Sequence, residues 1–244
     1  MRDIIRECNH TYINYLRQKT IQRSYLETSQ GRLSGSINGC TVIATLCVSM
    51  HLETHGGITN NQINKIIDND CVSLLKELRQ QHGLPEYSGI MMSDVFDYFL
   101  EIRLLFQYKF LGGTGGNILN PQHLNNLIML LQGEEGITSH LKAAAVFYFR
   151  QHVISILKCS VDTYDVVESM GIFDFEKGSR TRCFGLDALH IHLCHYCFTH
   201  FSNENISFID TNPWEEGRTN YLTDPRCFQG FVWADLPYNA VFDM

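Results

Sequence analysis

One stretch, from Ser36 to Leu52, constrains this chain most because it places a cysteine at the start of an apolar helix. Glycine, serine and asparagine fill most of positions 35–39, and an apolar run with helical spacing follows until Gly56. Cys40 therefore falls in the first turn of the predicted helix, where unpaired backbone N–H groups and the helix dipole favour an anion. A thiol at that position is expected to ionise more readily, and the thiolate is the nucleophilic form of cysteine.

The cysteines of the chain indicate a reducing environment. There are nine among 244 residues, an odd number, scattered without the tight spacing of a disulfide scaffold. The charged stretch from Met1 to Glu7 lacks the apolar run of a signal peptide. We therefore expect reduced thiols and an intracellular location, cytoplasmic or nuclear. No apolar stretch reaches membrane-spanning length, so no membrane association is expected.

The charge of the chain argues against nucleic acid as a partner. There are 19 Lys and Arg against 26 Asp and Glu, which gives a formal net charge of −7. No basic stripe with interleaved aromatic residues is present, so nucleic acid binding is not expected. A mildly acidic chain is compatible with a basic or neutral protein substrate.

Helical patterns dominate the chain up to about residue 140, and strand patterns dominate after it. The predicted helices span residues 3–28, 59–69 and 70–81, a segment that begins at Ser93, and the run from Pro121 to Gly133. The predicted strands span residues 104–110, 145–149, 153–158, 164–168, 206–210 and 230–236, and a further helix spans 186–201. We therefore predict an α+β fold in which a helical N-terminal half packs against an antiparallel sheet.

The length suits a single large domain of residues 1–244, and 15 Phe and 11 Tyr provide ample material for a core. Within that domain we expect an N-terminal helical segment at residues 1–34. We also expect a helical inserted subdomain at residues 58–135.

A cysteine nucleophile needs a base within hydrogen-bond reach and a third group that orients the base. His152 begins one predicted strand, and Glu168 ends the next one along the chain. Antiparallel strands joined by a short turn bring these two ends side by side, so His152 is the predicted base and Glu168 the predicted orienting residue. Asp165 is the second choice for the orienting role because it lies nearer the turn, and Ser169 is the third.

These segments resemble the Josephin family of deubiquitinases, which belongs to the papain-like cysteine peptidase superfamily. His-Val-Ile-Ser-Ile-Leu-Lys at 152–158, followed by Tyr-Asp-Val-Val-Glu-Ser at 164–169, is similar to the family's His-Trp-Phe, short strand and Asn-Leu-Asn-Ser. Asp-Leu-Pro at 235–237 is similar to the end of the last Josephin strand. The resemblance implies a papain-like fold with Cys40 as nucleophile, and it places His152 and Glu168 at the family's His and Asn.

The residue that binds the oxyanion departs from the family pattern. Papain-like enzymes carry a glutamine five or six residues before the cysteine, where this chain has Gly35 and Ser34. Gln30 lies ten residues before Cys40 and Asn38 lies two before it, so these two are the candidate side-chain donors to the oxyanion. The backbone N–H of Cys40 supplies a further donor.

The resemblance implies a thiol-dependent hydrolase that acts on ubiquitin or a ubiquitin-like protein joined through an isopeptide bond, without a metal or organic cofactor. Two other classes stay open. A catalytically inactive relative would bind ubiquitin or another protein through the same cleft, and the displaced glutamine is the reason to consider it. An amidase or acyltransferase would use the same three residues on a different substrate.

A helix rich in histidine and cysteine is another conspicuous motif. Six residues of metal-ligating type lie between His190 and His200, but on one helix they point around most of its circumference. Apolar residues recur at three- and four-residue steps between Leu186 and Tyr196. We therefore predict an amphipathic core helix rather than a zinc site.

The stretch from Leu111 to Asn117 is rich in glycine. It lacks the lysine and the spacing of a phosphate-binding loop. We predict that it is a flexible loop beside the active cleft.

Overall fold

The computed structural model describes residues 1–90, 105, 107–133, 142–171, 177–217, 220 and 223–235. At its centre lies a seven-stranded sheet with the order β1-β6-β5-β4-β3-β7-β2, in which each neighbouring pair is antiparallel. The strands are β1 (Ile21–Tyr25), β2 (Lys109–Asn117), β3 (Ala143–Phe149), β4 (His152–Ser160), β5 (Thr163–Glu168), β6 (Ser179–Phe184) and β7 (Cys227–Ala234). The predicted α+β class with an antiparallel sheet is confirmed.

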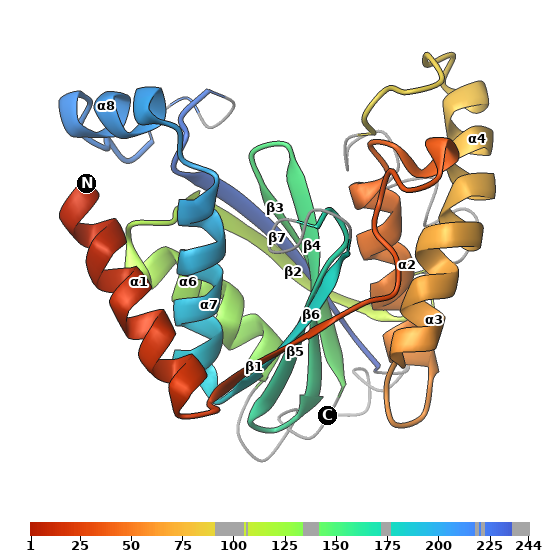
Figure 1. The fold of residues 1–244 in the computed structure, drawn as a ribbon, viewed down its shortest axis with the longest axis horizontal. Coiled ribbons are helices and arrows are strands. Elements are labelled where there is room, and N and C mark those ends of the chain that lie inside the picture. The colour runs from red at the N-terminus through yellow and green to blue at the C-terminus, as the bar shows by residue number, and fades with distance from the viewer. Residues whose placement is uncertain are drawn as a thin grey trace, which may run out of the picture.

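Helices cover both faces of this sheet, with α2, α3 and α4 on one face and α1, α6 and α7 on the other (Figure 1). The helices are α1 (Arg2–Arg17), η1 (Ser34–Ser36), α2 (Cys40–Glu53), α3 (Asn60–Lys65), η2 (Ile66–Asp70), α4 (Cys71–Gln81), α6 (Pro121–Gln132), α7 (Leu186–Thr199) and α8 (Asn203–Thr211). Two apolar cores result, which we call the α2 core and the α7 core. The α2 core includes Cys40, Val42, Ile43, Cys47, Val146, Tyr148 and Val153, and the α7 core includes Phe147, Phe149, Ile154, Ile156, Leu193 and Tyr196.

Strand β3 shows how the two cores share the sheet. All seven of its residues are buried, and successive side chains point to opposite faces. Tyr148 therefore belongs to the α2 core and Phe149 to the α7 core. A strand that is covered on both faces is apolar throughout, which explains the run Ala-Ala-Ala-Val-Phe-Tyr-Phe.

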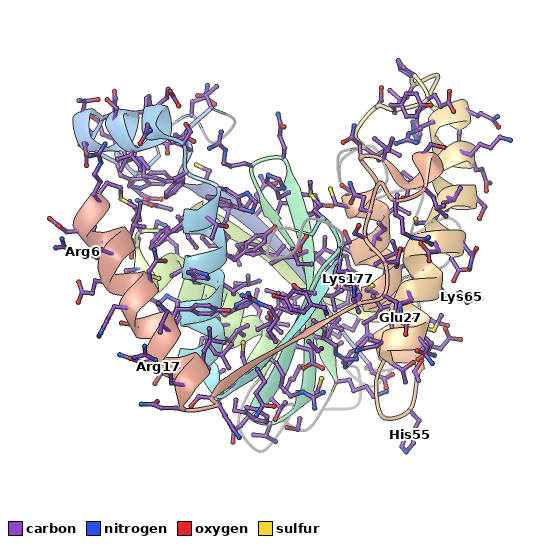
Figure 2. All side chains as sticks on the ribbon, in the orientation of Figure 1. Arg6, Arg17, Glu27, His55, Lys65 and Lys177 are labelled. Carbon is purple, nitrogen blue, oxygen red and sulfur yellow. The ribbon has the colours of Figure 1, made fainter. Side chains whose placement is uncertain are left out.

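Charged side chains mark the outer faces of the helices. Figure 2 shows Arg6 and Arg17 on α1, and Lys65 on α3, directed away from the sheet. Among the residues that the structure describes, no helix combines the length and the apolar character needed to cross a bilayer.

The strand predicted at 104–110 is misplaced, because β2 begins only at Lys109. Two further predicted elements are wrong. Residues 3–28 form α1 and β1 rather than one helix, because the chain turns at Lys19, whose φ is 59°. The predicted strand at 206–210 is part of helix α8. The side chain of Ser202 caps this helix by accepting a hydrogen bond from the backbone N–H of Asn205, and the Asn205 side chain completes the capping box.

The glycine-rich stretch is also not a loop, because it forms edge strand β2, paired with β7. Its glycines permit close contact between the two strands. A Cβ at Gly113 would lie 3.1 Å from the ring of Phe231, and a Cβ at Gly115 would lie 2.7 Å from the carbonyl oxygen of Phe228. The glycines therefore serve strand packing.

Strand β2 also lies within residues 58–135, the segment expected to be a helical subdomain, and β1 lies within residues 1–34. The domain boundaries stay a prediction. The helix predicted from Ser93 lies outside the described residues, as do Leu236 and Pro237 of the C-terminal motif.

Candidate active site

Cys40 is the first residue of α2, as the sequence predicts. The loop before it is held against α4, because a Cβ at Gly39 would lie 2.5 Å from Leu75 Cδ1 and 2.9 Å from the Ser36 carbonyl oxygen. Asn38 supplies the left-handed backbone turn, with a φ of 57°, that leads into the helix. Cys40 is 7% exposed and lines a cavity of about 650 Å³.

The sulfur of Cys40 faces backbone polar groups of both α2 and β4. Its thiol donates to the carbonyl oxygen of Gln151, 3.9 Å away. Burial raises the pKa of the Cys40 thiol, and the charge of Glu168 adds to the increase. The backbone N–H groups of Val153, Thr41 and Cys40 itself act in the opposite direction. Burial outweighs the helix start, so the expectation of an easily ionised thiol does not hold in this state of the protein.

The ring of His152 is turned away from this sulfur. Side chains alternate along β4, so Val153 lies in the α2 core with Cys40 whereas Ile154 lies in the α7 core. By the same alternation His152 faces the α7 side. There its ring stacks on His200, at the end of α7, with 3.8 Å between ring centroids and 25° between ring planes. No hydrogen bond joins Cys40 and His152 in the described part of the chain.

The strand register explains the other neighbour of His152. Its Nδ1 lies 3.1 Å from the Sδ of Met170. Ser155 pairs with Val167, so the continued ladder places Met170, rather than Glu168, opposite His152. The residue opposite His152 is therefore Met170, two positions beyond the predicted Glu168.

Buried and charged groups set the electrostatics around the ring and the sulfur. Glu168 is 2% exposed, and its carboxylate accepts a hydrogen bond from the backbone N–H of Met170. Burial, followed by the positive charge of Arg150, lowers the pKa of His152. The imidazole is therefore neutral near pH 7 and able to accept a proton. The orienting role of Glu168 stays a prediction.

Asp165 is engaged elsewhere and does not orient His152 in this structure. It pairs with Leu157 in the sheet, five residues along β4 from His152. Its fully buried carboxylate accepts from Arg180 Nε at 2.9 Å and from Arg182 Nε at 2.8 Å. Burial by itself raises the pKa of Asp165, but the two arginines more than offset burial, so the pKa is lowered.

We expect Asp165→Ala to lower the free energy of unfolding by about 3–5 kcal/mol, because it leaves two arginines without their buried partner. Asp3→Ala is the matched control, since Asp3 and Arg6 form an exposed pair worth at most about 1 kcal/mol. Urea denaturation of the three proteins measures both values. Because the pKa of Asp165 is lowered on folding, its contribution is present above the unfolded-state pKa of about 4 and is lost as pH falls through the folded-state pKa. An equal decrease in the free energy of unfolding of both variants would contradict the stabilising role assigned to the buried Asp165.

The cavity beside Cys40 also receives both candidate oxyanion donors, Gln30 and Asn38. The backbone N–H of Gln30 donates to the Ser169 carbonyl oxygen at 2.6 Å, and its Oε1 accepts from the Ser169 hydroxyl at 3.3 Å. These contacts hold Gln30 against Ser169, at the cavity that Cys40 also lines. The Asn38 amide instead donates to the Tyr87 carbonyl oxygen at 2.8 Å. The Asn38 amide is therefore engaged away from the sulfur, and the role of Gln30 as donor stays a prediction.

Three side chains around the site were missed in the sequence: Tyr148, Met170 and His200. Tyr148 pairs with Val153 across the β3–β4 hairpin and lines the cavity, whereas Met170 and His200 contact His152. The signal for Tyr148 was available, because a two-residue turn at 150–151 makes residues 148 and 153 neighbours.

The histidine- and cysteine-rich segment forms α7, and its apolar side faces the α7 core as predicted. His192 and His195 pack on Tyr12 of α1, with ring centroids 5.8 Å and 3.8 Å from it. Among the described residues, no group of three His, Cys, Asp or Glu side chains converges as metal ligands would.

Comparison with known proteins gives a likeness in structure alone. No family model matches the chain, and no curated protein matches it in sequence. A similar solved structure is that of the ubiquitin-specific protease encoded by murine cytomegalovirus tegument protein M48, in complex with a ubiquitin-based suicide substrate. The TM-score is 0.52 at 8% identity, and the match covers 87% of this chain and 85% of that chain. The chain therefore shares the α+β fold of that protease, whereas the resemblance to the Josephin family stays a prediction.

Proposed function

We propose that this chain is a thiol-dependent hydrolase that cleaves isopeptide bonds to ubiquitin or a ubiquitin-like protein. The observation that carries the proposal is the position of the Cys40 sulfur, at the start of α2, in a large cavity, beside backbone N–H groups of α2 and β4. The likeness in fold to a protease captured with a ubiquitin-based suicide substrate supports the substrate class.

In the proposed reaction, the Cys40 sulfur attacks the carbonyl carbon of the scissile bond and its proton passes to His152. His152 then gives this proton to the leaving amine, and water hydrolyses the thioester that remains on Cys40. Glu168 orients the imidazole. The backbone N–H of Cys40 and the amide of Gln30 stabilise the oxyanion.

This reaction requires His152 to leave its stack on His200 and turn toward the sulfur. The backbone on either side of His152 lies beside the sulfur, which supports the proposal: the Gln151 carbonyl accepts from the Cys40 thiol and the Val153 N–H acts on the same sulfur. Reorientation at the first residue of β4 then assembles the pair. We propose that substrate binding in the cavity favours this reoriented state.

The resting arrangement also favours a second candidate, an inactive papain-like module that binds ubiquitin or another protein through the same cavity. Its specific support is that burial holds Cys40 as a thiol while His152 contacts His200 and Met170. A module of this kind would bind without cleaving.

We expect Gln30→Ala to lower kcat about 100- to 1000-fold, because it removes a donor to the oxyanion. Asn38→Gly is the matched control from the same cavity, because glycine removes the amide but keeps the left-handed turn at this position. The Asn38 amide is bonded to the Tyr87 carbonyl, so its loss is expected to change kcat less than about tenfold. Steady-state hydrolysis of a ubiquitin conjugate with a fluorogenic leaving group measures both. A loss of kcat confined to Asn38→Gly would contradict the assignment of Gln30.

Reaction with ubiquitin that carries an electrophile at its C-terminus tests the function directly. We expect a covalent adduct at Cys40, located by mass spectrometry of the digested protein. Reaction of Cys40 with iodoacetamide but not with the ubiquitin probe would contradict the substrate class and favour an amidase or acyltransferase. Tight binding of ubiquitin without reaction of Cys40 would favour the inactive module.

A further inference from the structure

The hydroxyl of Tyr148 is a buried polar group that the fold does not use. Tyr148 is 8% exposed, and its hydroxyl makes no hydrogen bond of acceptable geometry with any described residue. A buried hydroxyl without a partner destabilises the folded state, so most such groups are paired. The ring packs edge-on against Phe231 with 5.9 Å between centroids, a contact that phenylalanine would make equally well. The hydroxyl therefore needs an explanation of its own.

This hydroxyl belongs to the surroundings of the Cys40 sulfur. Tyr148, Cys40 and Thr41 line the same cavity. Tyr148 also pairs with Val153, whose backbone N–H acts on that sulfur. Burial raises the pKa of Tyr148 well above its usual range, and the charge of Cys40 adds to the increase. The Thr41 hydroxyl opposes the increase as a neighbouring hydrogen-bonding group, but it donates its own proton to the Ile90 carbonyl oxygen at 2.6 Å. The phenol therefore keeps its proton, and can donate it, well above the pH at which tyrosine usually ionises.

In the resting structure the Tyr148 hydroxyl and the Cys40 thiol form no hydrogen bond. The thiol donates to the Gln151 carbonyl oxygen, and a thiol sulfur is only a weak acceptor. Ionisation turns the sulfur from a hydrogen-bond donor into an acceptor, because a thiolate accepts strong, charge-assisted hydrogen bonds. The backbone N–H groups of Val153 and Thr41 donate to the thiolate. A side-chain donor in the same cavity would stabilise the thiolate further.

We propose that the Tyr148 hydroxyl donates a hydrogen bond to the Cys40 sulfur once that sulfur has lost its proton, and so helps to activate the nucleophile. The inference deepens the proposed function, in which the departing proton goes to His152. It gives the unpaired hydroxyl a partner that exists only in the ionised state. It also explains why a group that weakens the resting fold occupies this position.

Alkylation of Cys40 by iodoacetamide, followed from pH 5 to pH 10, tests the proposal without any ubiquitin substrate. The readout is the rate of modification of the peptide that contains Cys40, determined by mass spectrometry. Below the pKa of the thiol, we expect Tyr148→Phe to lower the rate of modification at least about tenfold, which corresponds to a rise of about one unit in the pKa of Cys40, because a hydrogen bond to the charged form is lost. We also expect the thermal midpoint of this variant to equal or exceed that of the wild type. An unchanged pH profile would overturn the proposal.

Tyr164→Phe is the matched control. Tyr164 is fully buried in the α7 core, but its hydroxyl donates to the Val161 carbonyl oxygen at 3.2 Å. We expect this variant to be no more stable than the wild type and to leave the Cys40 profile unchanged. Of the two variants, only Tyr148→Phe should therefore change the reactivity of Cys40, and Tyr164→Phe should not be the more stable one. An equal fall in the rate of modification in both variants would overturn the proposal.

A second substitution keeps the test decisive if Tyr148→Phe does not fold. Replacement of Tyr148 by 3-fluorotyrosine preserves the shape and makes the phenol a stronger donor, so the rate of Cys40 modification below the pKa of the thiol should rise. No rise in this rate would overturn the proposal. Failure here differs from failure of the proposed function. If the Tyr148 variants leave Cys40 alkylation unchanged but the wild type reacts with the ubiquitin probe, only the role of Tyr148 is contradicted. If the variants change alkylation as expected but the wild type does not react with the probe, only the substrate class is contradicted.

Discussion

Replacement of Cys40 by alanine is expected to abolish both hydrolysis and reaction with an electrophilic ubiquitin, because the variant has no nucleophile at the start of α2. The fold should survive. Cys40 is nearly buried at the edge of the α2 core, and its thiol makes one long hydrogen bond, to the Gln151 carbonyl oxygen. Circular dichroism and the thermal midpoint establish folding, and probe labelling establishes the loss.

Cys227→Ser is the control for this prediction. Cys227 begins β7, lines the same cavity and is 9% exposed, so it is the alternative nucleophile in reach of the same probe. Burial raises its pKa to about 12, and it lies on a strand rather than at a helix start. We expect Cys227→Ser to retain labelling. Labelling that persists in Cys40→Ala and disappears in Cys227→Ser would move the nucleophile to Cys227.

His152→Ala is expected to lower kcat about 100- to 10,000-fold, which is the usual contribution of a positioned general base. The loss of kcat should be larger at neutral pH than at alkaline pH, because at alkaline pH the thiol ionises without a general base. The wild-type imidazole is neutral near pH 7, since burial and Arg150 lower its pKa. The pH dependence of kcat/KM for the two proteins measures this difference. Parallel pH profiles of equal height would contradict the assignment of His152.

The variant His200→Ala tests whether His152 or the adjacent His200 acts as the base. In the resting structure His200 stacks on His152, and its pKa is lowered to about 3 by burial and by the adjacent His152 and Arg150. Removal of His200 releases one contact that holds the base away from the sulfur. We therefore expect this variant to be as active as the wild type or more active. A loss as large as that of His152→Ala would identify His200 as the base.

The main features of the site were visible in the sequence because they depend on local patterns. Turn residues before an apolar run predicted that α2 begins at Cys40, and the structure places the helix start there. β-branched and aromatic runs predicted β4 and β5, which follow each other as an antiparallel pair. These signals need only residues that are close together in the chain.

The direction of the His152 side chain was not visible, because it depends on the phase of a strand. His152 and Val153 are adjacent, yet one faces the α7 side and the other the α2 core. A shift of one residue in the predicted start of the strand exchanges the two faces. Both faces of this sheet are covered by helices, so no alternation of polar and apolar residues marks the phase. The ladder partner of His152 was misplaced by two residues because the turn between β4 and β5, with the register shift between Lys158 and Ser160, sets the pairing.

The missed strand β2 has a similar cause. Its glycines lower the intrinsic preference for a strand, and their role appears only when Phe228 and Phe231 of β7 lie against them. Helix α8 was missed because a short β-branched run was given more weight than the capping box at Ser202.

A crystal structure of the adduct between Cys40 and an electrophilic ubiquitin tests the central claim most directly. The account predicts that the His152 ring has left His200 and lies within hydrogen-bond distance of the modified sulfur, with Gln30 directed at the same centre. An adduct in which His152 still stacks on His200, 3.8 Å away as in the resting protein, would contradict the claim that these two residues act together.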